Sequence, residues 1–207
     1  MGHPLESFSG LKAEGLILMQ FAKDSFFLAL QQRLAGLNPA RTVTINGTSV
    51  PAVVVVENLP PMSAEPQPNA FYIEWGAADV IDGHAGNNAL MSLDVVVSYY
   101  TLGTVQSAVD RGRLLAQLDD ELLGICQPPN TEKMDYTQAP AADLGTSVFW
   151  GQPSFAEGKG SGMFWGRVSF PARAESGTTE AAENLQDARV ERKARLTIYF
   201  FSEVTLL

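Results

Sequence analysis

The sequence predicts an α+β fold in which a mostly antiparallel β-sheet is packed by two main α-helices, with long loop excursions. Two observations support this prediction. Two long segments carry apolar residues at helical spacing, whereas most of the remaining chain consists of alternating or continuous apolar runs bounded by turn residues. Because these strand-like runs mostly follow one another directly, hairpins are expected rather than parallel crossovers. We expect a single domain spanning residues 1–207.

The first helix is predicted over residues 11–37. Its apolar residues recur three, four or seven positions apart and form one stripe: Leu16, Met19, Phe26, Leu30, Leu34 and Leu37. Asn38-Pro39 ends the helix, because proline cannot continue it. Ile17, Leu18 and Phe27 add more apolar surface than one stripe needs, which indicates a second packing surface such as a subunit contact.

A β-hairpin is predicted next, since Asn46-Gly47 is a strong signal for a two-residue turn. The four consecutive valines from Val53 indicate a strand that is buried on both faces. The predicted strands cover residues 41–45, 50–56, 70–75, 89–100, 144–151, 163–173 and 190–201. In the long strand at 89–100, Met91, Leu93, Val95, Val97 and Tyr99 share one face.

The second helix is predicted over residues 104–125, with Thr104 as its N-cap. Its buried seam consists of Ala108, Leu115, Leu118, Leu122 and Ile125. Polar segments without a period are expected to form excursions at about 127–143, 152–162 and 174–188, and residues 79–88 are expected to form a polar turn.

The composition makes several kinds of chemistry improbable. The chain has one cysteine and two histidines, so it can form no intrachain disulfide and has few ligands for a transition metal. Its formal net charge of −9 argues against a general electrostatic grip on nucleic acid. No apolar run approaches the roughly 20 residues that span a bilayer, and the first residues lack the pattern of a secretory signal. An intracellular origin is expected.

Three weak motifs remain. The glycine-rich run at 157–162 lacks the spacing of a phosphate-binding loop, and a hairpin tip is the simpler interpretation. Asp79, Asp82 and His84 are the best candidates for a metal or enzyme site, but a polar turn between two strands is the preferred interpretation. Cys126 ends an amphipathic helix, where a small buried apolar residue is the commoner role. We therefore expect no catalytic, cofactor or metal site.

Charge is distributed unevenly along the chain. Residues 57–143 contain 13 acidic and 3 basic residues, whereas Arg189, Arg192, Lys193 and Arg195 cluster at the last predicted strand. One interpretation is a solvated strand protected by charge. The other is a basic subunit interface that meets acidic residues of a neighbouring copy or of another protein, as in head-to-tail ring assembly.

The order of elements resembles that of the tail terminator (tail completion, neck) proteins of long-tailed bacteriophages. The segment 89–125, in which a long strand runs into the second helix, carries this resemblance together with the leading helix at 16–37. The chain departs from the family's pattern in the excursion at 127–143, in the segment at 174–186 and in its greater length than the compact members.

The resemblance implies a structural virion protein of the tail or neck, assembled in the host cytoplasm. It implies a homohexameric ring that caps the tail tube protein, contacts the head-tail connector or stopper, and lets genome DNA pass without specific binding. No cofactor or membrane contact is implied. A head-to-tail stopper or adaptor and a non-viral α+β assembly or binding protein remain the alternatives.

Overall fold

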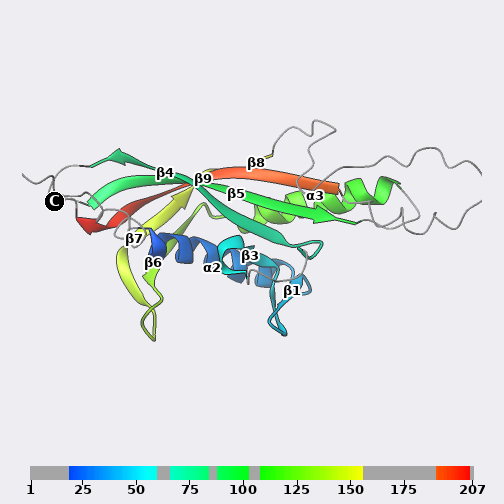
Figure 1. The fold of residues 1–207 in the computed structure, drawn as a ribbon, viewed down its shortest axis with the longest axis horizontal. Coiled ribbons are helices and arrows are strands. Elements are labelled where there is room, and N and C mark those ends of the chain that lie inside the picture. The colour runs from blue at the N-terminus through cyan, green and yellow to red at the C-terminus, as the bar shows by residue number, and fades with distance from the viewer. Residues whose placement is uncertain (1–18, 60–65, 84–87, 103–107, 156–189, 206–207) are drawn as a thin grey trace, which may run out of the picture.

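The structure is a computed structural model that describes residues 19–59, 66–83, 88–102, 108–155 and 190–205. In chain order, the elements are α2 (Gln20–Leu37), β1 (Thr42–Ile45), β2 (Thr48–Pro51), β3 (Val53–Val55), the short 3-10 helix η1 (Val56–Asn58), β4 (Phe71–Asp82), β5 (Asn88–Thr101), α3 (Ala108–Ile125), β6 (Asn130–Asp135), β7 (Ala142–Trp150), β8 (Ser154–Phe155) and β9 (Val190–Thr205). Figure 1 shows them in place.

The main sheet has seven strands, and six of them follow the order β3-β4-β5-β9-β7-β6 while β8 also pairs with β9. All neighbours are antiparallel except β3 and β4, which run parallel. The long strands β4, β5 and β9 form its centre, and β1 and β2 form a separate hairpin. The predicted α+β class with a mostly antiparallel sheet is confirmed.

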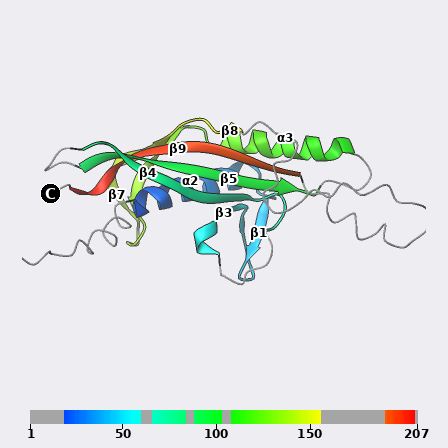
Figure 2. The same ribbon diagram turned by 45° about the horizontal axis from the view of Figure 1, so that its top comes forward.

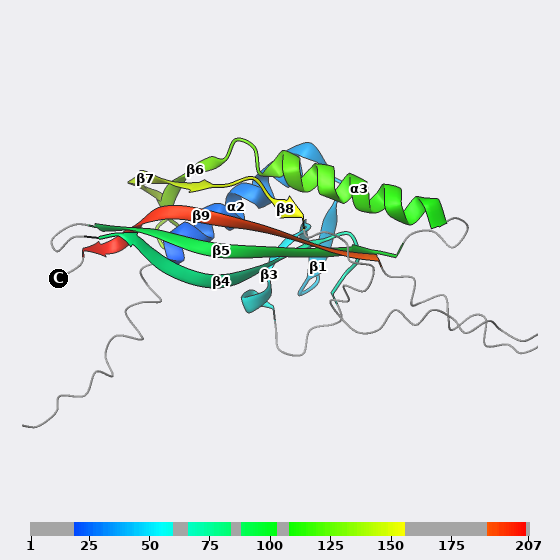
Figure 3. The same cartoon turned by 90° about the horizontal axis from the view of Figure 1, so that it is seen from above.

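The two helices pack on the same face of the central strands, which we call the inner face (Figures 2 and 3). The face of β5 predicted as core lines it and is buried, and so is the matching face of β9: Met91, Leu93, Val95, Val97 and Tyr99 of β5, and Ala194, Leu196, Ile198 and Phe200 of β9. Full burial of a valine, leucine, isoleucine, phenylalanine or methionine side chain in this layer stabilises the fold by about 1.5–3 kcal/mol.

The helical stripes are confirmed where the structure describes them. Phe26, Leu30 and Leu34 of α2 are buried, as are Leu115, Leu118, Leu122 and Ile125 of α3. Leu37 differs, because it is 55% exposed at the last residue of α2. The predicted helix residues before Met19 and the predicted cap Thr104 lie outside the described residues.

The predicted hairpin is also confirmed. Asn46 and Gly47 both have positive φ, 50° and 78°, and Ile45 pairs with Thr48 across the turn. This backbone conformation suits asparagine and glycine. The valines of β3 are buried as expected, but Val56 is 38% exposed because the chain turns into η1 there.

The segment expected as an excursion at 127–143 contains strand β6 and the turn into β7. Its polar sequence did not predict a strand, because its buried polar groups are hydrogen-bonded to distant parts of the chain. Lys133 is only 3% exposed and donates a hydrogen bond from Nζ to the carbonyl of Phe201 at 2.7 Å. The Met134 amide donates to Ser25 Oγ at 2.9 Å, which ties β6 to α2.

Strand β4 is longer than predicted. The segment expected to turn from residue 79 onward continues as a strand to Asp82, paired with β5 across two register shifts. At the first shift, Gly76 lies so close to Asp94 that an added Cβ would meet its backbone oxygen at 3.2 Å. A β-bulge of this kind lets pairing continue past residues that otherwise indicate a turn.

Arg33 of α2 holds the junction between the helices and the β6–β7 hairpin. Its guanidinium donates hydrogen bonds to the carbonyls of Ile125 at 3.1 Å, Pro128 at 2.7 Å and Asn130 at 2.7 Å. It also lies 5.1 Å from the centre of the Trp150 ring. One side chain therefore satisfies carbonyls at the end of α3 and at the start of β6.

We expect Arg33→Lys to lower the free energy of unfolding by about 2 kcal/mol, because an ammonium cannot reach three carbonyls and stack on Trp150 together. Urea denaturation measures the change. Gln32→Lys is the matched control, since residue 32 is exposed beside it on α2, and it should change stability by less than about 0.5 kcal/mol. Equal effects of the two substitutions would contradict this role.

Candidate assembly surface

The face of the sheet opposite the two helices, which we call the outer face, changes in character along the strands. Residues that alternate with the core positions of β4, β5 and β9 lie on it. Along its length, the surface is first covered by a loop, then charged, and finally aromatic.

At the covered end, Val56 of η1, Leu59 and Pro66 form a cleft with the sheet. The lining includes Val56, Leu59, Pro66, Tyr72, Ser98 and Tyr100. The Tyr72 hydroxyl accepts a hydrogen bond from the Gln67 amide at 2.6 Å, and the Tyr100 hydroxyl donates to the carbonyl of Pro66. These bonds fix Pro66 and Gln67 on the sheet, and this end of the long strand β5 is buried on both faces.

The middle of the outer face is charged. Register places Glu74, Val96 and Arg195 side by side on β4, β5 and β9, with Lys193 two residues before Arg195 on the same face. Partial burial lowers the pKa of Lys193, while the nearby Glu74 carboxylate opposes this shift. An acidic group on β4 and basic groups on β9 thus lie on either side of Val96, and such a separation of charge can orient a partner.

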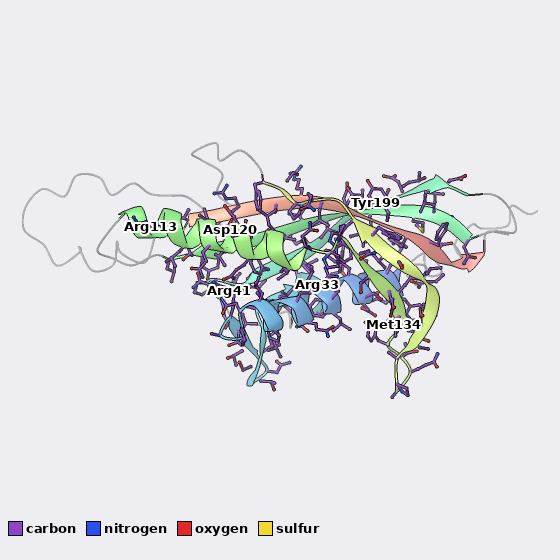
Figure 4. The ribbon with its side chains drawn as sticks, turned by 180° about the vertical axis from the view of Figure 1, so that it is seen from behind. Arg33, Arg41, Arg113, Asp120, Met134 and Tyr199 are labelled. Atoms are coloured by element: carbon purple, nitrogen blue, oxygen red, sulfur yellow. The ribbon has the colours of Figure 1, made fainter. Side chains whose placement is uncertain are left out.

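The far end carries exposed aromatic side chains, which we call the outer aromatic patch: Phe149, Tyr199 and Phe201. Phe149 of β7 pairs directly with Tyr199 of β9, which Figure 4 labels, and the three side chains are 51%, 39% and 45% exposed. Aromatic residues are enriched at protein–protein interfaces.

The predicted basic cluster is divided by strand geometry. Arg195 is exposed on the outer face, and Lys193 lies on the same face. Arg192 shares the parity of the core residues, so it points to the inner face and toward α3. Arg189 lies outside the described residues. The subunit-interface role of these four residues stays a prediction, but they do not all share one surface.

Arg192 takes part in a network that joins α3 to the sheet. Its Nη2 lies 3.3 Å from Asp119 Oδ2, and Tyr99 donates a hydrogen bond to the same carboxylate. Burial raises the pKa of Tyr99 far above its usual value, and its bond to Asp119 raises it further. The phenol therefore stays protonated and keeps donating over the whole physiological pH range.

The other predicted candidates do not assemble into a site among the described residues. Asp79 and Asp82 lie on strand β4 instead of a turn, while His84 and the run at 157–162 fall outside the description. Within the described part of the chain, no group of three histidine, cysteine or acidic residues is arranged to hold a metal. No described helix is long and apolar enough to cross a membrane.

Cys126 is fully buried, as its position at the end of the helix predicted. Burial raises the pKa of its thiol to about 12, and nearby Arg33 only partly opposes this shift. Its carbonyl accepts a hydrogen bond from the Trp150 indole at 2.8 Å. A thiol in this environment is protonated at neutral pH and a poor nucleophile.

Neither the outer aromatic patch nor the role of Asp119 was predicted from the sequence. Phe149 and Tyr199 each fall in a predicted strand, but only the pairing of β7 with β9 brings them together. The odd positions of β9 at 199 and 201 could have signalled the patch, because they alternate with its core face. Asp119 gave no signal, since an acidic residue on an amphipathic helix is usually solvated.

Comparisons with known proteins give little identification. No protein-family model and no curated protein matches the chain. Among solved structures, it is similar to a chain described as "Virion of native gene transfer agent (GTA) particle", with 16% identity over 94% of this chain and 100% of that chain. The TM-score is 0.34, which is too low to establish a common fold.

We expect opposite outcomes for reversing the two arginines. Arg192→Glu places a carboxylate against Asp119 and should lower the free energy of unfolding by about 2 kcal/mol. Arg195→Glu changes an exposed position and should alter it by less than about 0.5 kcal/mol. Chemical denaturation of the two variants measures the difference, and similar losses would contradict the assignment of the two side chains to opposite faces.

Cys126 should react slowly with a chromogenic disulfide reagent at pH 8, because its thiol is buried and protonated. In denaturant, one thiol per chain should react at once. As an exposed control, Ser49→Cys adds a thiol at the hairpin of β1 and β2, and this thiol should react without denaturant. Rapid reaction of Cys126 in the folded protein would reopen the possibility of a nucleophilic cysteine.

Proposed function

We propose that this chain is a structural virion protein of a phage neck, a tail terminator whose copies form a hexameric ring. The ring would cap the tail tube and present a surface to the head-tail connector. The layout of the fold is the observation that carries this proposal. An amphipathic helix, a hairpin, a long strand and a second helix occur in the order that the resemblance implies.

The packing supports a scaffold role for these elements. Strand β5 (Asn88–Thr101) and helix α3 (Ala108–Ile125) are the elements of the resembling segment, and α3 packs against β5 and β9 (Figure 1). The network of Tyr99, Asp119 and Arg192 fixes α3 to this strand and to β9. A subunit held rigidly in this way can meet its neighbours in one geometry, which closed ring assembly requires.

The outer face supports assembly as well. The outer aromatic patch offers contact area that loses little conformational entropy when it is covered, while the charged middle can set orientation. Both features lie on one face, away from the helices. A subunit contact or a contact with the tail tube could use this surface.

The acidic character of the chain agrees with passage of DNA through the proposed ring. The formal net charge of −9 and the acidic middle of the chain would repel a polyanion in the lumen and reduce sticking. On this proposal, the protein carries out no covalent chemistry and needs no cofactor. Genome DNA would pass without base-specific contacts.

Two measurements test the proposal. Light scattering and negative-stain microscopy of the purified full chain at high concentration, or mixed with its tail tube protein, should show rings of about six copies. In the particle that encodes the chain, disrupting its gene should give tails of irregular length, because nothing stops tube growth. Neighbouring genes for a tail tube, a tape measure and a portal would agree with this role.

The disruption separates the terminator from its closest alternative. Loss of a head-to-tail stopper or adaptor should leave tails of uniform length that fail to join filled heads. Normal particles after disruption would contradict both neck functions and favour a non-viral assembly or binding protein. A chain that stays monomeric alone and with tail tubes would contradict ring formation.

A further inference from the structure

Half of strand β4 lies at an open edge of the sheet. Strand β3 pairs only with Phe71–Ile73, so it protects the first part of β4 and ends there. From Gly76 to Ile81, β4 lies beside β5 on one side, where Ala78, Asp79 and Val80 are paired between two register shifts, and all six residues are exposed. Among the described residues, no strand pairs with the other side of this stretch.

The side chains of this edge are also incompletely covered. Val80 pairs with Met91 and therefore lies on the inner face, yet it is 56% exposed whereas Met91 is 8% exposed. Asp79 pairs with Ser92 and lies on the outer face. The edge thus offers apolar groups on one face, a carboxylate on the other, and a row of backbone donors and acceptors between them.

We propose that residues 164–170 of a second copy of this chain add as a strand to the open edge of β4. This inference rests on the proposed assembly of copies and identifies the contact between them. The segment reads Phe-Trp-Gly-Arg-Val-Ser-Phe and is followed by Pro171. A proline fits the end of an added strand because it cannot donate to a ladder.

The alternation of the segment complements the edge on both faces. Phe164, Val168 and Phe170 share one parity, and Arg167 has the other. In a paired strand, the apolar set would cover Val80 on the inner face while Arg167 would reach Asp79 on the outer face. Strand addition of this kind gains affinity from the backbone and specificity from alternate side chains.

The place of the segment in the chain and the place of the open edge in the sheet favour contact between copies. The segment joins β8 to β9, and Phe155 of β8 pairs with Ala194 on the side of β9 away from β5. In the strand order, β4 lies on the other side of β5 from β9, so its open edge is at the opposite edge of the sheet. Each copy can therefore give a strand on one side and receive one on the other, which is a head-to-tail contact that can close into a ring.

Crosslinking of paired single-cysteine variants tests the contact. Ala78→Cys on the edge and Val168→Cys in the segment are made in separate full-length chains carrying different tags. After mixing under assembly conditions, a short bis-maleimide should give a dimer containing one chain of each kind. Native Cys126 should stay unreacted because it is buried, and Ser49→Cys mixed with Val168→Cys should give at least tenfold less product.

Each alternative occupant gives a distinct product. A crosslink formed only within one chain of the double variant would overturn the proposal in favour of the chain's own segment. A crosslink from Ala78→Cys to Ser9→Cys within one chain would overturn it in favour of residues 1–18. Rings without a mixed dimer would overturn this contact and leave the proposed function standing, whereas a mixed dimer without rings would support the contact and contradict the ring.

A charge exchange provides an independent readout. Asp79→Arg and Arg167→Asp should each weaken association about fivefold at low salt, and mixing the two variants should restore it at this contact. Asp120→Arg is the matched control, because Asp120 is exposed on α3, and it should leave association unchanged. Equal weakening by all three changes, or no recovery in the mixture, would overturn the pairing of Arg167 with Asp79.

Discussion

The fold depends on one junction, where Arg33 of α2 meets Trp150 at the end of β7. The guanidinium satisfies carbonyls that the end of α3 and the following segment leave without helical partners, and it lies over the indole ring. The indole in turn donates to the Cys126 carbonyl, and Phe26 packs against it with ring centres 5.1 Å apart. Both helices and β7 are therefore positioned by one cation and one aromatic ring.

This junction explains why the two faces of the sheet differ so strongly. With both helices held on the inner face, charged residues of β9 must either find a partner there or point outward. Arg192 finds Asp119, whereas Arg195 lies on the outer face and is exposed. A run of basic residues thus divides into a stabilising ion pair and a surface charge, and only the second is free to serve a partner.

Most of the framework follows from the sequence, because apolar spacing reports burial directly. The stripe of α2 around Phe26, the seam of α3 around Leu118 and the Asn46-Gly47 hairpin are all present as predicted. Strand β6 was not predicted, because a lysine such as Lys133 is typical of an exposed loop. In the fold it is buried, and its ammonium donates a hydrogen bond to the carbonyl of Phe201. Periodicity cannot reveal a polar group whose partner lies far away in the chain.

The surface was harder to predict for a related reason. Whether an exposed residue matters depends on which strands become neighbours, and β7 and β9 are far apart in sequence although Phe149 and Tyr199 are paired. The open edge of β4 likewise arises because β3 ends after pairing with Ile73. An open strand edge with an exposed apolar residue such as Val80 can pair with strands of other molecules. The bulge at Gly76 and the charge of Asp79 oppose such pairing only in part. On the proposed function, a neighbouring copy would protect this edge by completing the sheet there.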